Sequence, residues 1–254
     1  MRRAPDLIEI FRESKVERCY VWWSSEVKIS RRLRSSHKNH EGTKMKLYMV
    51  PAAPNPTKVM LYIAERKAMG VDLGVEQIVV NTLKGKHKEP EHLARNPFGT
   101  LPVLELESGE CLVESLSIIL YLETIQPDNA LLSGSEIEKA LARDLERTIE
   151  LRLANSVGGY VHAVNSPFGL PPDPELGEKL KAGMDPALGY LESLLGDGRQ
   201  MLTSDRVSLA DLTLQSARQF ARFGKVDILE SYGEIAAWDL RYREREAAKE
   251  VLKF

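Results

Sequence analysis

A run of four apolar residues, Leu47 to Val50, opens the first patterned stretch of the chain and predicts a short strand. The segment PAAPNPTKV (51–59) follows. Its three prolines predict irregular backbone from 51 to 56, because proline lacks an N–H and disfavours helix at the preceding residue. Apolar positions then predict a helix from about Thr57 to Met69, ended by Gly70. Such a helix start directs free N–H groups and the positive end of the helix dipole outward, which favours a bound anion.

The rest of the pattern divides into a small α/β part and a helical part. In the first part we expect a strand at 74–81, a short helix at 88–96, hairpin strands at 101–106 and 111–113, and a helix at 114–125. A polar linker at 126–135 leads to four helices, expected at about 136–164, 174–195, 208–223 and 231–252. This order predicts a mixed α/β unit followed by an all-helical one.

Composition limits the classes of protein that remain. The chain has 254 residues, of which 43% are hydrophobic and 28% charged, enough for one large domain or two ordinary ones. No apolar run approaches the roughly 20 residues that span a bilayer, so no membrane partner is expected. The two cysteines, Cys19 and Cys111, form no CxxC motif and no His/Cys cluster. A disulfide scaffold and a metal site are therefore not expected, and a reducing, cytoplasmic location fits best.

Charge is distributed unevenly, because residues 1–44 carry a net charge of +5 and the remainder carries −7. The basic stretch has no sustained periodicity and is typical of a solvated tail. An RNA-binding arm and a transit peptide are alternatives. Aromatic residues among the basic ones favour the former, and glutamates oppose the latter. We expect an extension outside the fold, with Met45 as a natural beginning of the folded part, and no nucleic-acid partner.

Two motifs carry a specific signal: NPFGTLPVLELESGECLVES at 96–115 and SLAD at 208–211. Both resemble the glutathione transferases, in a match that runs from Met45 to near the C-terminus. The resemblance implies a thioredoxin-like α/β N-terminal domain at 45–126, a linker at 127–135 and an all-α helical domain at 136–254. It also implies glutathione as co-substrate.

The resemblance also assigns the residues that hold one end of the glutathione tripeptide. Pro102 matches a proline that is cis in the family, which leaves the backbone of Leu101 free to pair with the cysteinyl peptide. Glu114 is expected to pair with the ammonium group, and Ser115 to hold the γ-glutamyl carboxylate at a helix N-terminus. The alternatives are a trans proline that opens a strand and an ordinary helix cap by Ser115.

His87 and Thr100 match family positions that contact the glycyl end of glutathione. Many relatives carry Gln or Lys in place of Thr100. The alternative for His87 is a solvated loop histidine.

No ionisable side chain stands where the family places its catalytic residue. Ala53 occupies the position of a catalytic Ser or Cys, and Tyr48 lies too early, on the first strand, to replace it. Lowering a thiol pKa by about two units from about 8.5 requires roughly 2.7 kcal/mol. One hydrogen bond to a charged group contributes about 1.5–3 kcal/mol, and a helix N-terminus adds about 0.3–1. Asn55 is therefore the predicted catalytic residue; the alternative is that it only shapes the turn.

The helical half is expected to supply structure and the surface for the second substrate. Ser208 and Asp211 of SLAD predict a capping box, in which each side chain satisfies the other residue's exposed amide. The electrophile pocket is expected where residues 158–170 face the proline-rich loop. Candidate residues for this pocket are Tyr160, His162, Phe168 and Trp238, although aromatic residues at helical spacing also suit a core.

Two classes of function follow. The first is a glutathione transferase that directs the thiolate at a hydrophobic electrophile in detoxification, or at a disulfide or peroxide. The second is a non-catalytic binding or assembly module of the same fold. The resemblance also implies a homodimer. Glu114, Ser115 and Pro102 favour the enzyme, whereas Ala53 and the basic extension favour the module.

Overall fold

Strand β1 (Met45–Met49) is an inner strand of a four-stranded mixed sheet in the order β2-β1-β3-β4. The computed structural model describes residues 45–254, so the predicted N-terminal extension lies outside the described residues. β1 runs parallel to β2 (Val75–Val79), with Met45 opposite Val75, and antiparallel to β3 (Val103–Glu105). β3 and β4 (Cys111–Leu112) form the predicted hairpin.

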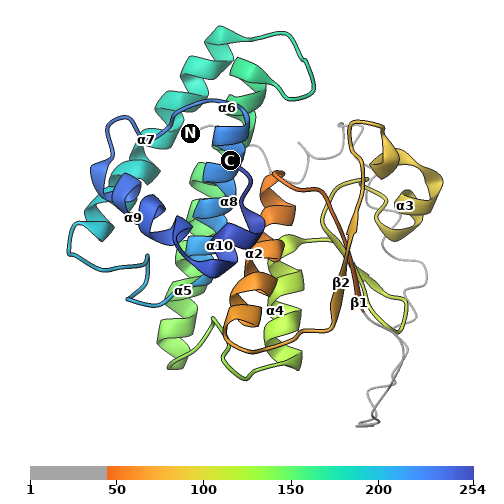
Figure 1. Ribbon diagram of the computed structural model, residues 1–254. Coiled ribbons are helices and arrows are strands. Elements are labelled where there is room, and N and C mark those ends of the chain that lie inside the picture. The colour runs from red at the N-terminus through yellow and green to blue at the C-terminus, as the bar shows by residue number, and fades with distance from the viewer. Residues whose placement is uncertain (1–44) are drawn as a thin grey trace, which may run out of the picture. The chain divides into compact units, whose positions relative to one another are not determined.

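Helices cover both faces of this sheet. Figure 1 shows α2 (Pro54–Ala68) and α4 (Ser115–Ile125) on one face and α3 (Pro90–Arg95) on the other. A 3₁₀ turn, η2 (Lys86–Lys88), precedes α3. The predicted thioredoxin-like arrangement is therefore present, with element boundaries within a few residues of those expected.

The C-terminal half is helical throughout its regular elements, as predicted. Its elements are α5 (Glu136–Ile149), a π-helical turn η3 (Glu150–Ala154), α6 (Asn155–Asn165), α7 (Pro174–Leu195), α8 (Leu209–Phe223), α9 (Gly233–Arg243) and α10 (Glu246–Val251). None of the helices over residues 45–254 is long and apolar enough to cross a bilayer.

Helix α2 packs between the two halves of the molecule, and nearly all of its faces are buried. Val59, Leu61 and Tyr62 have no exposed surface, and they belong to one apolar core that extends from the sheet into the helical half. The helix packs against α4 on the sheet side and against α8 and α10 on the other. Amphipathic periodicity alone suggests a half-exposed helix, so this degree of burial was not predicted.

Two predicted helices differ in extent from those observed. Helix α2 begins at Pro54 rather than near Thr57, because Pro54 and Pro56 fall in the first turn, where a helix needs no N–H donors. The helix expected at 231–252 is interrupted at Glu244 and Arg245, although no Gly or Pro stands there. The interruption brings the Arg245 guanidinium against Glu65 of α2, a tertiary contact that the local sequence does not reveal.

The capping box of α8 is confirmed, and one predicted pocket residue is not. Ser208 and Asp211 bond reciprocally at the helix start. Trp238 has no exposed surface, and its indole N–H donates to Asp211 Oδ1 at 2.9 Å. The expectation that Trp238 lines the electrophile pocket was therefore wrong. A buried indole that bonds a buried carboxylate is a core residue.

Candidate functional site

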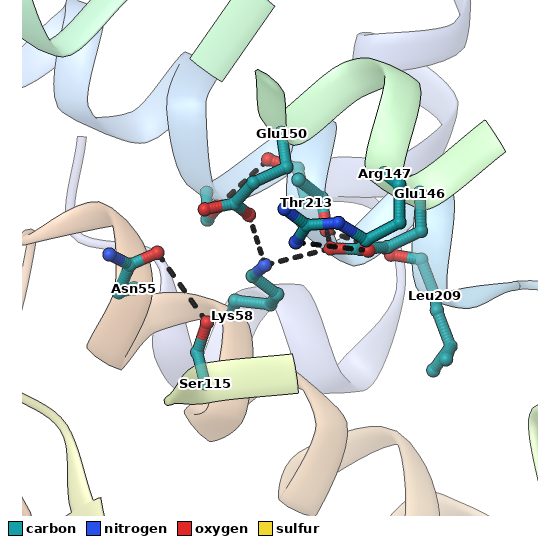
Figure 2. Close-up of polar contacts among 9 residues, drawn as sticks. Asn55, Lys58, Ser115, Glu146, Arg147, Glu150, Leu209 and Thr213 are labelled. Carbon is teal, nitrogen blue, oxygen red and sulfur yellow. Dashed lines mark hydrogen bonds and ion pairs between the residues drawn. The ribbon is translucent and has the colours of Figure 1, made fainter. Parts of the chain in front are cut away.

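Two helix N-termini meet at the proline-rich loop. Asn55, in the first turn of α2, and Ser115, the first residue of α4, are 60 positions apart in sequence. The Ser115 hydroxyl nevertheless donates to Asn55 Oδ1 at 3.5 Å, as Figure 2 shows. Both helices direct the positive ends of their dipoles at this corner, which is a favourable environment for an anion.

The start of α2 has an unusual backbone. Ala53 is the N-cap residue and has no side-chain oxygen to cap the helix, while its carbonyl accepts the Thr57 N–H at 3.0 Å. Ala52 is buried and has a φ of 70°, a left-handed conformation that costs roughly 1–2 kcal/mol for an L-residue. Of the first three residues of the helix, only Asn55 carries a backbone N–H, because the other two are prolines.

Glu114 lies where the β4 hairpin passes into α4. It is the N-cap residue of that helix, with extended backbone and an exposed side chain that makes no capping bond. Ser115 beside it is 6% exposed. The structure therefore leaves the Glu114 carboxylate available at a helix start, next to a mostly buried hydroxyl.

The bond between Leu101 and Pro102 is cis, as the resemblance implied. Leu101 is half-buried and precedes the paired part of β3, which begins opposite Tyr48 at Val103. Pro102 is buried.

His87 lies in the turn η2 and close to the loop that carries Thr100. Gly99 makes this approach possible, because a Cβ there would lie 2.8 Å from the His87 carbonyl oxygen, and its φ is +59°. The Nδ1 atom of His87 is buried without a hydrogen-bond partner among the described residues. Burial, followed by the charges of Lys88 and His92, lowers the pKa of His87.

Asn96 and His92 fix Thr100, a role that the sequence analysis missed. The Asn96 amide donates to the Thr100 carbonyl at 3.0 Å and to its hydroxyl at 2.9 Å. His92 Nε2 donates to the same carbonyl at 3.1 Å. Asn96 has no exposed surface. The Asn-Pro that opens the first motif could have indicated this structural role, because asparagine side chains commonly bond nearby backbone groups in turns.

Tyr48 takes no part in this corner, as predicted. It lies on β1, and its hydroxyl donates to Glu105 Oε2 at 3.0 Å. The Arg95 guanidinium covers its ring, 4.2 Å from the ring centroid.

On the helical side, His162 is the centre of an aromatic cluster. Its ring stacks on exposed Phe168 at 5.5 Å and lies 5.6 Å from the ring of Phe220. Two further rings extend the row. The Phe223 ring lies 6.3 Å from that of Phe220, and the Phe254 ring lies 5.0 Å from that of Phe223. The sequence analysis missed the last three residues, because they come from α8 and the chain end.

A second unpredicted feature is a buried ion cluster beside the helix start. Lys58 is 1% exposed, and its ammonium donates to Glu146 Oε1 at 2.8 Å and to Glu150. The Thr213 hydroxyl donates to the same Glu146 oxygen at 3.0 Å. Figure 2 shows Lys58 between these carboxylates and the Asn55–Ser115 pair. In the sequence, Lys58 stands directly before the apolar run 59–64, which gives no sign that its side chain is buried.

These features define a thioredoxin-like fold with an anion-favouring corner where two helix N-termini meet. Residues 43–124 match the family model described as "Glutathione S-transferase, N-terminal domain". The chain is 32% identical over 216 residues to glutathione S-transferase 2 of Saccharomyces cerevisiae, covering 83% of this chain and 90% of that protein. The chain belongs to the glutathione S-transferase family, which confirms the resemblance and the expected enzyme class.

Solved structures agree with this assignment. The crystal structure of Gtt2 from Saccharomyces cerevisiae matches with a TM-score of 0.70 and 29% identity, covering 82% of this chain and all of that one. A glutathione S-transferase domain-containing protein from Marinobacter aquaeolei matches with a TM-score of 0.71 and 30% identity, covering 80% of this chain and 99% of that one. The fold class is thus a thioredoxin-like domain followed by an all-α domain.

Proposed function

We propose that the chain binds glutathione against the thioredoxin-like domain and stabilises its thiolate for attack on a hydrophobic electrophile. The observation that carries this proposal is the convergence of the α2 and α4 N-termini, where Asn55 and Ser115 face each other. Glutathione has two carboxylates, an ammonium and a thiol. A corner with two positive helix ends therefore suits its anionic groups.

Each end of the tripeptide has candidate residues. Glu114 pairs with the ammonium group. The N–H groups at the start of α4 hold the γ-glutamyl carboxylate, and the Ser115 hydroxyl joins them by turning away from its 3.5 Å contact with Asn55 Oδ1. The backbone of Leu101, before Pro102, pairs with the cysteinyl peptide as an added strand does. The exposure of Glu114 at a helix start supports these roles.

At the glycyl end, we assign His87 and Thr100. The buried Nδ1 of His87, which has no partner among residues 45–254, supports this assignment because buried polar atoms are rarely left without a hydrogen bond. The proximity of the two loops at Gly99 supports a shared contact.

Asn55 stabilises the sulfur anion in this proposal. Its Oδ1 faces the Ser115 hydroxyl, which leaves its amide N–H₂ free to donate elsewhere. A donated bond of about 1.5–3 kcal/mol, together with the helix dipole, would supply the roughly 2.7 kcal/mol that corresponds to two pKa units. No side chain has to accept the thiol proton permanently, because the anion itself is the stable species.

The electrophile occupies the surface near the His162 ring cluster. Tyr160, His162 and Phe168 remain its candidate contacts, and exposed Phe168 supports an apolar second substrate. Disulfides and peroxides are further substrates for attack by the thiolate, because glutathione itself supplies the sulfur. Assays with a model aryl halide, an organic hydroperoxide and a mixed disulfide separate these reactions.

The decisive experiment measures the pKa of the bound thiol by ultraviolet titration of the thiolate. Asn55→Ala should raise that pKa by about one to two units, because it removes one hydrogen bond to the anion. Asn81→Ala, at an exposed loop asparagine, is the control and should leave the pKa unchanged. An unchanged pKa in Asn55→Ala would remove Asn55 from the mechanism.

A binding or assembly module without turnover is the second candidate, and Ala53 at the N-cap of α2 favours it, since this cap offers no hydroxyl to the sulfur. Glutathione binding without turnover of any of the three test substrates would support this candidate. Turnover of any one of them would exclude it.

We further propose a homodimer in the cytoplasm with a role in detoxification. Ile137 and Leu141 are 65% and 60% exposed and lie one turn apart on α5, which supports a contact between copies. Light scattering of the purified chain tests this oligomeric state. Free Cys111 fits a reducing compartment. We also propose the division into domains at 45–126 and 136–254.

A further inference from the structure

The first turn of α2 has few stabilising contacts of its own. Its N-cap residue, Ala53, makes no side-chain bond, and Pro54 and Pro56 have no N–H. The preceding residue, Ala52, is held in the left-handed region. Such a conformation persists only where surrounding contacts hold it. Contacts with other segments must therefore fix the position of Asn55.

Apart from the Ser115 hydroxyl, which contacts Asn55 itself, these contacts come from the helical domain. Gln219 of α8 donates its side-chain amide to the Thr57 hydroxyl at 3.2 Å, and both residues have no exposed surface. One residue later, Lys58 donates to Glu146 of α5 and to Glu150 of η3. Thr57 and Lys58 lie within one helical turn of Asn55, so contacts to them set the position of that turn.

Glu150 has a distinctive place in the fold. It is the first residue of the π-helical turn that joins α5 to α6. π-helical turns are rare and occur frequently at functional sites. Helix α6, which follows this turn, carries Tyr160 and His162 of the proposed electrophile surface. The Lys58–Glu150 pair thus joins the thiolate corner to the beginning of the electrophile helix.

The charge of this cluster opposes a simple electrostatic role. Two carboxylates face one ammonium, and Glu146 Oε2 is buried without a hydrogen-bond partner among residues 45–254. Among residues 45–254, the other cation paired with these carboxylates is half-exposed Arg147, 3.8 Å from Glu146. Lys58 and its two carboxylates alone have a formal charge of −1, and with Arg147 the cluster is neutral, so it offers no net positive charge to a neighbouring thiolate. Any benefit of Glu150 to the thiolate must then be geometric.

We propose that Glu150 and Lys58 are positioning residues: their buried ion pair holds the first turn of α2, and with it Asn55, in the geometry that stabilises the glutathione thiolate. This inference rests on the proposed function, because it acts through Asn55. It also assigns the π-helical turn a role, since that turn places the Glu150 carboxylate at Lys58.

The geometric and electrostatic roles predict opposite signs in one variant. Glu150→Met removes both the negative charge and the anchor for Lys58. Positioning predicts that the pKa of the bound thiol rises by about half a unit or more, with about a threefold loss of kcat below that pKa. A pure charge effect predicts that the same pKa falls, because a nearby negative charge has been removed.

The conservative variant supplies the rescue. Glu150→Gln removes the charge but keeps an oxygen that can accept from Lys58, so positioning predicts a pKa near the wild-type value. Lys58→Arg keeps the cation and should behave likewise. In all these variants, the Kd for S-methylglutathione should stay within about twofold, because Glu114 and Ser115 are untouched.

Two controls separate this role from general stability and from the proposed function. Glu65→Gln alters another buried carboxylate of α2, paired with Arg245 at the far end of the helix, and should leave the thiol pKa unchanged. The double variant Asn55→Ala/Glu150→Met should show no higher pKa than Asn55→Ala alone, because Glu150 acts through Asn55.

The outcomes are distinct. If Asn55→Ala raises the thiol pKa while Glu150→Met lowers it or leaves it unchanged, the positioning role is wrong and the proposed function stands. Additive effects in the double variant also overturn the positioning role. If Asn55→Ala itself has no effect, the assignment of Asn55 fails, and the inference that rests on it fails too. Circular dichroism confirms that each variant tested is folded.

Discussion

Helix α2 carries buried ions near both of its ends, and the two ends differ in charge balance. At the C-terminal end of α2, called the far end below, each buried carboxylate pairs with one cation. Glu65 accepts two bonds from Arg245 at 2.8 and 2.7 Å, and Arg66 pairs with Glu123 at 3.1 Å. Arg66 also donates to the Tyr62 hydroxyl and to backbone carbonyls of the linker. This end has the features of a structural network.

At the near end, which is the N-terminal end of α2, one ammonium faces two carboxylates, and Glu146 Oε2 has no hydrogen-bond partner among residues 45–254. The adjacent helix start lacks a side-chain cap, follows a residue with positive φ, and exposes Asn55. Each end leaves one buried polar atom without a hydrogen-bond partner among residues 45–254, Glu146 Oε2 at the near end and Arg66 Nε at the far end. The near end differs because it adds an uncapped helix start and a residue with positive φ. Backbone strain beside an uncapped helix start is typical of functional sites. The comparison therefore separates residues that hold the fold from residues to which we assign the chemistry.

The largest expected effect is a loss of stability when the buried ion pair at the far end is removed. Arg66→Met leaves Glu123 buried without its cation, so the free energy of unfolding should fall by about 3–5 kcal/mol. Urea unfolding measures this loss. The thiol pKa of bound glutathione should not change, because Arg66 lies roughly 16 Å along the helix axis from Asn55.

The neighbouring Lys67 provides the control for this variant. Its pair with Glu250 is well exposed, so Lys67→Met should alter stability little. Equal losses in Arg66→Met and Lys67→Met would show that the buried network at the far end does not stabilise the fold as argued.

The second-largest expected effect is a loss of glutathione affinity at the near end. Glu114→Ala should weaken glutathione binding about tenfold, because the ligand's ammonium loses a charged hydrogen-bond partner. Stability should hardly change, since the Glu114 side chain is exposed and caps no helix. Calorimetric titration measures the affinity, with Glu107→Ala, on the exposed hairpin, as the matched control. Wild-type affinity in Glu114→Ala would remove this residue from the site.

Sequence reasoning predicted the parts of this comparison that depend on local pattern. The hairpin, the α4 helix start at Glu114 and Ser115, and the capping box at Ser208 and Asp211 were all found where expected. Turn and cap chemistry involves residues within a few positions of each other, so the printed order of residues reveals it.

The parts that sequence reasoning missed depend on contacts between distant segments. The Lys58 cluster draws on residues about 90 positions further along, and the Arg245 contact interrupts a helix that local propensity would continue. Trp238 illustrates the converse, because an aromatic residue that suited a pocket is a buried partner of Asp211. Periodicity shows that a face is apolar, but not which segment covers it.

A smaller effect sharpens the picture of the far end. The Tyr62 hydroxyl donates to Glu123 Oε1 at 2.8 Å, and Tyr62 has no exposed surface. Tyr62→Phe removes one hydrogen bond but no charge, so the free energy of unfolding should fall by about 1 kcal/mol. Tyr190→Phe, at a half-exposed tyrosine, should have no measurable effect in the same urea titration. A loss as large as that of Arg66→Met would mean that the hydroxyl, rather than the guanidinium, keeps Glu123 stable.

The smallest expected effect concerns the glycyl end of the proposed site and its response to pH. Burial, then Lys88 and His92, lowers the pKa of His87 in the free protein, which favours the neutral imidazole. A bound glycyl carboxylate would favour the protonated ring and raise that pKa. Binding then takes up a proton, so affinity should increase a few-fold as pH falls from about 7.5 to about 6.

S-Methylglutathione is the appropriate ligand for this measurement, because its sulfur cannot ionise and so adds no pH dependence of its own. His87→Gln should bind it with an affinity that is nearly constant over the same pH range, since glutamine does not titrate. His92→Gln is not a suitable control, because His92 holds Thr100 in place. A pH dependence that is the same in wild type and His87→Gln would place the glycyl carboxylate elsewhere, and the near end of the comparison would then be confined to Asn55, Glu114 and Ser115.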